Sequence, residues 1–110
     1  MRLAQDVLLW EEEGRTFRLE GHLTQGEAVD IANSTEYGLQ SGVMTSNLEN
    51  IRYCINNLKV GAVNINEGPQ FDMPNIPFGG VKRSGFGREL GLHALEGYSE
   101  IKSVFISTEG

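Results

Sequence analysis

Residues 39–66 read LQSGVMTSNLENIRYCINNLKVGAVNIN, and the order of residue types in this stretch decides the fold class. A short strand is predicted at about Leu39–Thr45, and the β-rich run VGAVNIN at residues 60–66 predicts a second strand. Between them, Ser46 and Glu49 have the spacing of a capping box, which predicts the start of a helix. Strand, helix and strand with short connections form a βαβ unit, in which the two strands run parallel and the crossover is right-handed.

The predicted helix in this unit carries one apolar stripe at the helical period, made of Leu48, Ile51, Ile55 and Leu58. Cys54 lies in the middle of the helix beside this stripe, and no His is near it in the sequence. A reactive thiol has a helix N-terminus, a cation or a base beside it. We therefore interpret Cys54 as a structural residue that packs as a small hydrophobe.

The residues before the βαβ unit predict a helix and, ahead of it, a β-hairpin. Thr24 and Glu27 have capping-box spacing, so a helix is expected to begin there and to end before Tyr37-Gly38. Within residues 1–26, the apolar run VLLW is followed by a turn centred on Glu13-Gly14 and by TFRLEGHL, in which apolar and polar residues alternate. Because an isolated hairpin is only marginally stable in water, we expect this one to pair with another strand.

The residues after the βαβ unit predict a long loop at 67–87, a short helix at Arg88–Gly97 and a final strand at Ile101–Ser107. Loops longer than about 15 residues within a compact domain are usually functional or disordered. This loop mixes its prolines with Phe71 and Ile76, which favours a loop that packs. The predicted fold class is therefore α/β: a small, mostly parallel sheet with helices packed on it and an antiparallel portion.

The composition is that of an ordinary globular domain, with 110 residues, 39% apolar and 22% charged. The chain has no apolar run near the roughly 18 residues of a membrane span, and its N-terminus lacks the apolar core and cleavage site of a secretory signal. One Cys is compatible with a reducing compartment, so we predict a cytoplasmic protein. A net charge of −6 argues against nucleic-acid and membrane partners, since basic residues concentrate only at Lys82, Arg83 and Arg88.

The segment PFGGVKRSGFGRELG, residues 77–91, is rich in glycine, as are two phosphate-binding motifs. A P-loop requires Lys and a hydroxyl residue where Phe86-Gly87 stands, and a dinucleotide fingerprint requires a preceding strand and a different glycine spacing. Neither motif fits. The glycines are then explained by a close approach of two backbone segments or by positive φ. No metal site is predicted, because His22 and His93 have no ligand-like neighbours at metal-binding spacing.

Four blocks of the sequence together resemble the C-terminal part of the NAD(P)-dependent aldehyde dehydrogenases. They are EAVDIANSTEYGLQSGVMT, LKVGAVNIN, PFGGVKRSGFGRELG and YSEIKSV, and they cover about residues 27–106 in the same order and spacing. The variant VGAVNINEGP is most similar to branches that act on small polar aldehydes of the lactaldehyde, succinate-semialdehyde or phosphonoacetaldehyde type.

The resemblance implies a reaction and two substrate-binding residues. Enzymes of this family oxidise an aldehyde through a Cys thiohemiacetal, pass hydride to the nicotinamide and release the acid when water attacks the thioester. Phe71 lies in the loop that borders the aldehyde entrance in the family, and Phe78 matches the aromatic residue next to the catalytic thiol. Gly79 and Gly80 would let the backbone fold tightly beneath Phe78. The glycine-rich segment is then expected to form a pocket wall.

The resemblance also implies what this sequence lacks. The family's catalytic Cys, general-base Glu, oxyanion Asn and cofactor-binding domain lie upstream of the matching blocks, and Cys54 does not align with the catalytic Cys. Just before EAVDIAN, this sequence has FRLEGHLTQG in place of a Glu-Ile-Phe-Gly-Pro-type segment. We therefore expect a truncated family member that is inactive alone. It should have no catalytic, cofactor-binding or metal residues, and should bind neither NAD nor NADP, the cofactors of the family.

The expected division is residues 1–26 as a hairpin extension and residues 27–110 as the aldehyde dehydrogenase-like segment. In the family, the final strand joins a small sheet that bridges subunits, so we predict that Val7–Leu23 pairs with Ile101–Ser107, within the chain or between copies. The expected partners are further copies of the chain or a full-length relative. Two other functions stay open: a non-catalytic assembly or binding module, and one half of a split dehydrogenase. An unrelated fused sequence at the N-terminus stays open as well.

Overall fold

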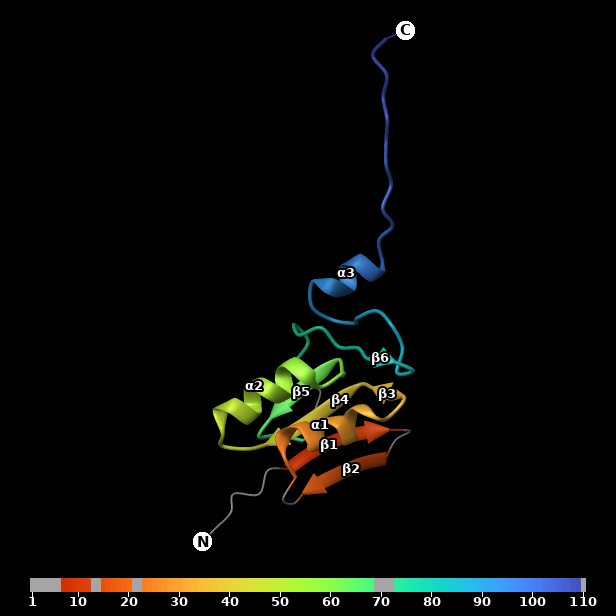
Figure 1. Ribbon diagram of the computed structural model, residues 1–110. Helices are drawn as coiled ribbons and strands as arrows, with labels where there is room; N and C mark the ends of the chain where they lie inside the picture. The colour runs from red at the N-terminus through yellow and green to blue at the C-terminus, as the bar shows by residue number, and fades with distance from the viewer. Residues whose placement is uncertain (1–6, 13–14, 21–22, 69–72, 110) are drawn as a thin grey trace.

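The computed structural model describes residues 7–12, 15–20, 23–68 and 73–109, and the fold in this part of the chain is a small α/β layer with an extended tail (Figure 1). In chain order, its elements are β1 (Val7–Glu12), β2 (Arg15–Glu20), α1 (Gln25–Asn33), β3 (Tyr37–Gly38), β4 (Gln40–Met44), α2 (Leu48–Asn57), β5 (Ala62–Ile65), β6 (Val81–Lys82) and α3 (His93–Gly97).

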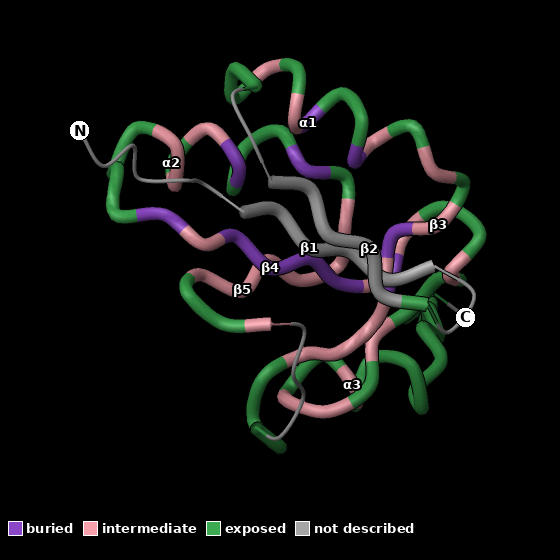
Figure 2. The backbone as a smooth tube through the Cα atoms, turned by 90° about the horizontal axis from the view of Figure 1, so that it is seen from below, coloured by how far each residue is buried: buried purple, intermediate pink, exposed green. Residues whose placement is uncertain are grey.

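The predicted βαβ unit is present. Strands β4 and β5 are parallel, in a register that runs from Gln40 opposite Ala62 to Val43 opposite Ile65, and α2 connects them. Figure 2 shows α1 and α2 together on one side of these strands, with α3 on the other side. The α/β fold class predicted from the sequence is therefore confirmed, but the prediction of a mostly parallel sheet is wrong, because only β4 and β5 pair in parallel whereas β1 pairs antiparallel with both β2 and β4.

Helices α1 and α2 begin with side-chain caps. Thr24 caps α1 as predicted: its Oγ1 accepts from the Glu27 N–H at 3.2 Å, and its own N–H donates to Glu27 Oε2 at 2.9 Å. For α2, the prediction that Ser46 is the cap is wrong by one residue. Asn47 occupies this position, because its Oδ1 accepts from the N–H of both Glu49 and Asn50, at 2.8 and 3.1 Å.

The N-terminal hairpin belongs to the main sheet. Strand β1 pairs antiparallel with β2, from Val7 opposite Glu20 to Glu12 opposite Arg15, while the predicted turn at Glu13-Gly14 lies outside the described residues. The other edge of β1 pairs antiparallel with β4, which gives the order β2-β1-β4-β5. Because β2 and β4 occupy both edges of β1, the partner of the hairpin within this chain is β4.

The predicted final strand Ile101–Ser107 is not formed within this chain. Residues 99–109 have no regular secondary structure, and Figure 1 shows them running away from α3 on the side opposite β2. The pairing of this segment with the hairpin inside one chain is therefore wrong. Its projection explains extents of 82 × 28 × 25 Å and a radius of gyration of 18.8 Å, against about 13 Å for a compact domain of 100 residues.

The core lies between helices α1 and α2 and strand β4. Among the side chains that the structure describes, its buried apolar members are Val29, Ala32, Val43, Cys54 and Leu58. Cys54 is 7% exposed, which supports its interpretation as a packing residue. The stripe predicted for α2 is buried only at its end, since Leu48 is 72% and Ile55 is 53% exposed. Ile51 of the same stripe is half-buried, so within the described part of the chain this face of α2 is only partly covered.

Candidate functional site

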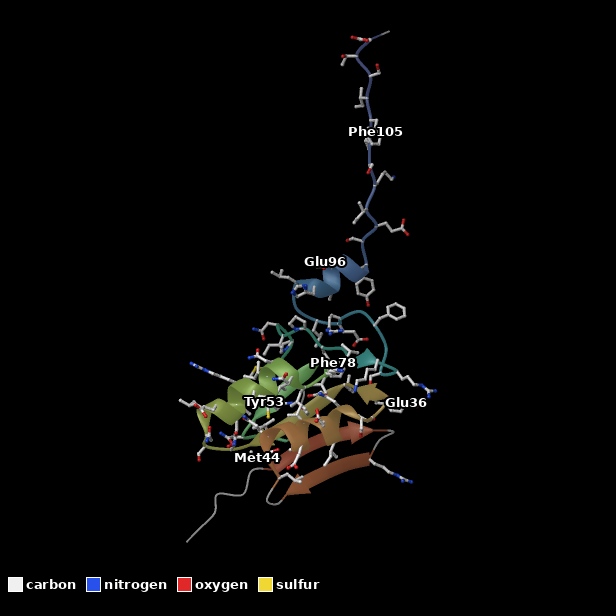
Figure 3. All side chains as sticks on the ribbon, viewed as in Figure 1. Glu36, Met44, Tyr53, Phe78, Glu96 and Phe105 are labelled. Carbon is white, nitrogen blue, oxygen red and sulfur yellow. The ribbon has the colours of Figure 1, made fainter. Side chains whose placement is uncertain are left out.

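The glycine-rich segment folds back on itself at Phe78. The Phe78 N–H donates to the Glu89 carbonyl at 2.8 Å, and the Glu89 N–H donates to the Phe78 carbonyl at 2.7 Å, so the two residues form an isolated antiparallel bridge. The Phe78 side chain is half-buried and lies between the four-stranded sheet and α3 (Figure 3). The bridge places the Phe78 ring on a short stretch of contacting backbone, residues 78–79 and 87–89, which we call the wall.

Two glycines without side chains make this wall possible. A Cβ at Gly61, at the start of β5, would overlap the carbonyl of Gly79. A Cβ at Gly79 would in turn overlap the carbonyl of Gly87. The Gly61 N–H donates to the carbonyls of Gly38 and Leu39 at 3.1 and 3.0 Å, which ties the wall to β3. The predicted close approach of backbone segments is therefore present.

Left-handed backbone makes the turns after the wall. Gly85 and Gly87 have φ values of 112° and 85°, where side chains are disfavoured. Arg88 closes the base of this turn, because its Nη1 donates to the Gly80 carbonyl at 2.9 Å and to the Gly87 carbonyl at 2.7 Å. The Arg88 charge thus holds the backbone of its own loop.

The other two cations of the segment contact the last residue of α1 and the residues that follow it. The Lys82 Nζ donates to the carbonyls of Asn33 and Thr35, each at 2.9 Å. The Arg83 Nη1 pairs with Glu36 Oε2 at 2.7 Å, and its guanidinium lies 5.8 Å from the centre of the Tyr37 ring. The sequence shows these residues as a basic cluster, and only the structure shows that each cation binds groups of this chain.

The residues singled out in the sequence are not gathered into one reactive centre. Phe78 stands on the wall, whereas Phe71 lies outside the described residues. Cys54 packs in the core among Val29 and Leu58, so it is not part of the wall. His93 lies 3.8 Å from Glu96, and no group of three metal-ligating side chains occurs in the described part of the chain.

The cations of the glycine-rich segment contact groups of the chain itself. A pyrophosphate is usually held by free backbone N–H groups at a helix N-terminus and by cations. Here α3 has only five residues, and Lys82, Arg83 and Arg88 contact groups of the chain.

In the part of the chain that the structure describes, no helix has both the length and the apolar character needed to cross a bilayer.

The α/β fold agrees with what the sequence blocks imply, and so do the comparisons with known proteins. The model of the aldehyde dehydrogenase family matches residues 22–104. This match covers well over half of the chain. The chain therefore belongs to the aldehyde dehydrogenase family.

Two relatives show the extent of the similarity. Lactaldehyde dehydrogenase of Methanococcus aeolicus is 45% identical over 83 residues, covering 76% of this chain and 18% of the relative. The chloroplastic betaine aldehyde dehydrogenase of Atriplex hortensis is 44% identical over 105 residues, covering 93% of this chain and 20% of the relative. This second alignment extends into residues 1–26, and the domain boundary after residue 26 stays a prediction.

Two solved structures share the fold. The NAD-dependent aldehyde dehydrogenase from Sinorhizobium meliloti has a TM-score of 0.72 and 39% identity, covering 79% of this chain and 17% of that one. The NAD⁺ complex of an aldehyde dehydrogenase from Bacillus cereus has a TM-score of 0.71 and 42% identity, covering 78% and 17%. The 110 residues thus span a fifth or less of these relatives.

Proposed function

We propose that this chain is a C-terminal module of an aldehyde dehydrogenase, in which Phe71 and Phe78 bind the aldehyde as part of the wall of its site. The reaction is NAD(P)-dependent oxidation of the aldehyde to an acid. The observation that carries the proposal is the Phe78–Glu89 bridge, which holds a half-buried aromatic ring on a backbone wall shaped by Gly61 and Gly79. An apolar wall of this kind is typical of a small-molecule site.

The aldehyde is a small polar one in this proposal. The supporting relatives include lactaldehyde dehydrogenase of Methanococcus aeolicus and the NADP⁺-dependent succinate-semialdehyde dehydrogenase of Mycobacterium leprae. These enzymes are 45% and 44% identical to the chain over 83 and 81 residues. The two enzymes are named for different small polar aldehydes. The proposal therefore extends to this class of substrate and not to one particular aldehyde.

These 110 residues do not oxidise aldehydes by themselves. The reaction needs a thiolate that reaches the carbonyl carbon, and Cys54, the one cysteine of the sequence, is 7% exposed in the middle of α2. The residues that hold NAD or NADP are proposed to belong to a part of the enzyme outside this sequence. The module contributes the wall, and the rest of the enzyme contributes the thiol and the cofactor.

The test is an assay of NADH and NADPH formation with lactaldehyde, succinate semialdehyde and betaine aldehyde. We expect no turnover by the chain alone. Turnover that appears when a polypeptide carrying the remaining part of a lactaldehyde dehydrogenase is added would support the wall as one half of a split enzyme. In that mixture, Phe78→Ala should raise the KM for the aldehyde. Turnover by the chain alone would overturn the proposal.

A second candidate function is assembly, and the exposed tail favours it. Ile101, Phe105 and Ile106 are 102%, 93% and 83% exposed, which is unusual for large apolar side chains. The total accessible surface is 8495 Å², whereas a compact monomer of this mass has about 6,000 Å². We infer that Ile101–Ser107 of one copy pairs with the outer edge of β2 in another copy, or that the tail docks on a full-length relative.

Light scattering over a wide concentration range tests this second candidate. We expect a defined dimer or larger species, and we expect Val104→Pro to shift it toward the monomer because proline cannot donate a backbone hydrogen bond to a strand. A monomer at the highest concentration would exclude self-assembly. Binding to a full-length relative without any gain of activity would indicate an assembly module of the second kind.

A further inference from the structure

Lys82 joins the glycine-rich segment to a helix that is distant in the sequence. Its Nζ donates to the carbonyls of Asn33, the last residue of α1, and of Thr35, each at 2.9 Å. The last carbonyls of a helix have no partner within the helix, and a cation there is favourable for the helix dipole. The last turn of α1 contains no basic residue of its own. Lys82 therefore supplies the missing donor and the charge.

The backbone at Lys82 is held in a conformation that is unusual for lysine. Its φ is 56°, in the left-handed region that glycine normally occupies. Residues in sparsely populated backbone regions persist where surrounding contacts over-determine them, and they cluster at functional sites. In this case, the Nζ contacts with the carbonyls of Asn33 and Thr35 and the ladder pairing with Tyr37 all act on this residue.

Ser84 makes a second connection from the same segment. Its Oγ accepts from the N–H of Gly38, a buried residue of β3, at 2.9 Å. The Gly38 carbonyl accepts from the Gly61 N–H at 3.1 Å, and Gly61 lies directly against Gly79. A continuous set of contacts therefore runs from the Ser84 side chain through the backbone of Gly38 and Gly61 to Gly79, the residue that follows Phe78.

The ladder between these segments is short, and one further backbone hydrogen bond, from the Arg83 N–H to the Glu36 carbonyl at 3.0 Å, lies beside it. Strands β3 and β6 have two residues each and pair only Tyr37 with Lys82 and Gly38 with Val81. Ladders of this length are marginal in water. The side chains of Lys82 and Ser84 extend the connection on both sides of the ladder.

We propose that Lys82 and Ser84 are positioning residues: together they fix the wall that carries Phe78 relative to α1 and β5. The inference deepens the proposed function and rests on it for the role of Phe78 in binding the aldehyde. The geometric part concerns only the wall, so it is tested without catalysis.

The test is amide hydrogen exchange measured by NMR on the 110-residue chain. The reporters are the amides of Phe78 and Glu89, which bond each other across the bridge. The reference is the amide of Leu58, which donates to the Cys54 carbonyl at 2.9 Å within the core. We expect Lys82→Met and Ser84→Ala each to speed exchange of the two reporters by about tenfold, with Leu58 changed by less than about twofold.

A matched control and a rescue variant separate positioning from other effects. Lys59→Met removes the same charge from an exposed residue whose backbone N–H, rather than its side chain, binds Asn33. It should leave the reporters unchanged. Lys82→Arg keeps the cation and its donors and should restore most of the protection of the two reporters.

Three results would overturn the proposal. The first is unchanged exchange of Phe78 and Glu89 in Lys82→Met and Ser84→Ala. The second is equal acceleration of Leu58, which would show that these residues contribute to global stability instead. The third is an equal effect of Lys59→Met, which would show a general effect of charge. If the mixture with the remaining part of a lactaldehyde dehydrogenase shows no turnover, while the hydrogen exchange of the variants changes as expected, the result would count against the proposed function alone.

Discussion

The Gly79 carbonyl occupies the position that a Cβ of Gly61 would take, so the start of β5 and the wall beneath Phe78 are in direct backbone contact. The two residues are separated in the sequence by β5 and by most of the loop that follows it. Their contact is one of the connections that join the glycine-rich segment to the βαβ unit.

The first prediction concerns this contact. Gly61→Ala should lower the free energy of unfolding by about 1–3 kcal/mol, because overpacked groups must shift the backbone around them. Urea unfolding monitored by circular dichroism measures the change. Gly97→Ala is the matched control, since no atom lies within 4 Å of a Cβ placed there. Equal stability of the two variants would contradict the contact.

The second prediction concerns the start of α2. Asn47→Ala should lower the free energy of unfolding by about 1 kcal/mol, because Asn47 caps two backbone N–H groups. Ser46→Ala, at the exposed neighbouring position, should change it by less than about 0.5 kcal/mol. A larger loss for Ser46→Ala than for Asn47→Ala would restore Ser46 as the cap.

The third prediction concerns pH. The Thr24 backbone N–H, and then its hydroxyl, lower the pKa of Glu27 below its ordinary value of 4.5. A carboxyl whose pKa is depressed in the folded state stabilises the fold above the unfolded pKa and loses that contribution as the pH falls through the folded pKa. The urea midpoint should therefore decrease as the pH is lowered through 4.5 and below.

Glu27→Gln is the control for this pH dependence. The variant has no carboxylate at position 27 that could be protonated. The part of the decrease in the urea midpoint that comes from protonation of Glu27 should therefore be absent. A wild-type and a Glu27→Gln chain with the same pH dependence of the urea midpoint would show that the Glu27 carboxylate makes no contribution.

The fourth prediction concerns Cys54. Because the thiol is buried in the core, it should react with a disulfide reagent far more slowly in the native chain than in urea. The rate of thiol modification, followed by absorbance, measures this protection. Fast reaction in the native state would contradict the packing of α2 on β4 and would reopen Cys54 as a nucleophile.

The sequence by itself determined the local elements that lie close together along the chain. The βαβ unit follows from two β-rich runs on either side of one helical stripe, and the start of α1 follows from the pairing of Thr24 with Glu27. Each signal is carried by residues a few positions apart, so backbone preference and local hydrogen bonds are sufficient to read it.

Only the tertiary structure decided which edges pair and which charges are used. The hairpin was predicted to pair with Ile101–Ser107, yet β1 pairs with β4 and the tail extends from α3. In the sequence, Lys82 is one member of a basic cluster. In the structure, its Nζ donates to the carbonyl of Thr35, which is 47 positions away in the sequence. Any strand edge or carbonyl can accept these partners by its chemistry alone. The choice among them depends on the packing of distant segments, which no local pattern of residues encodes.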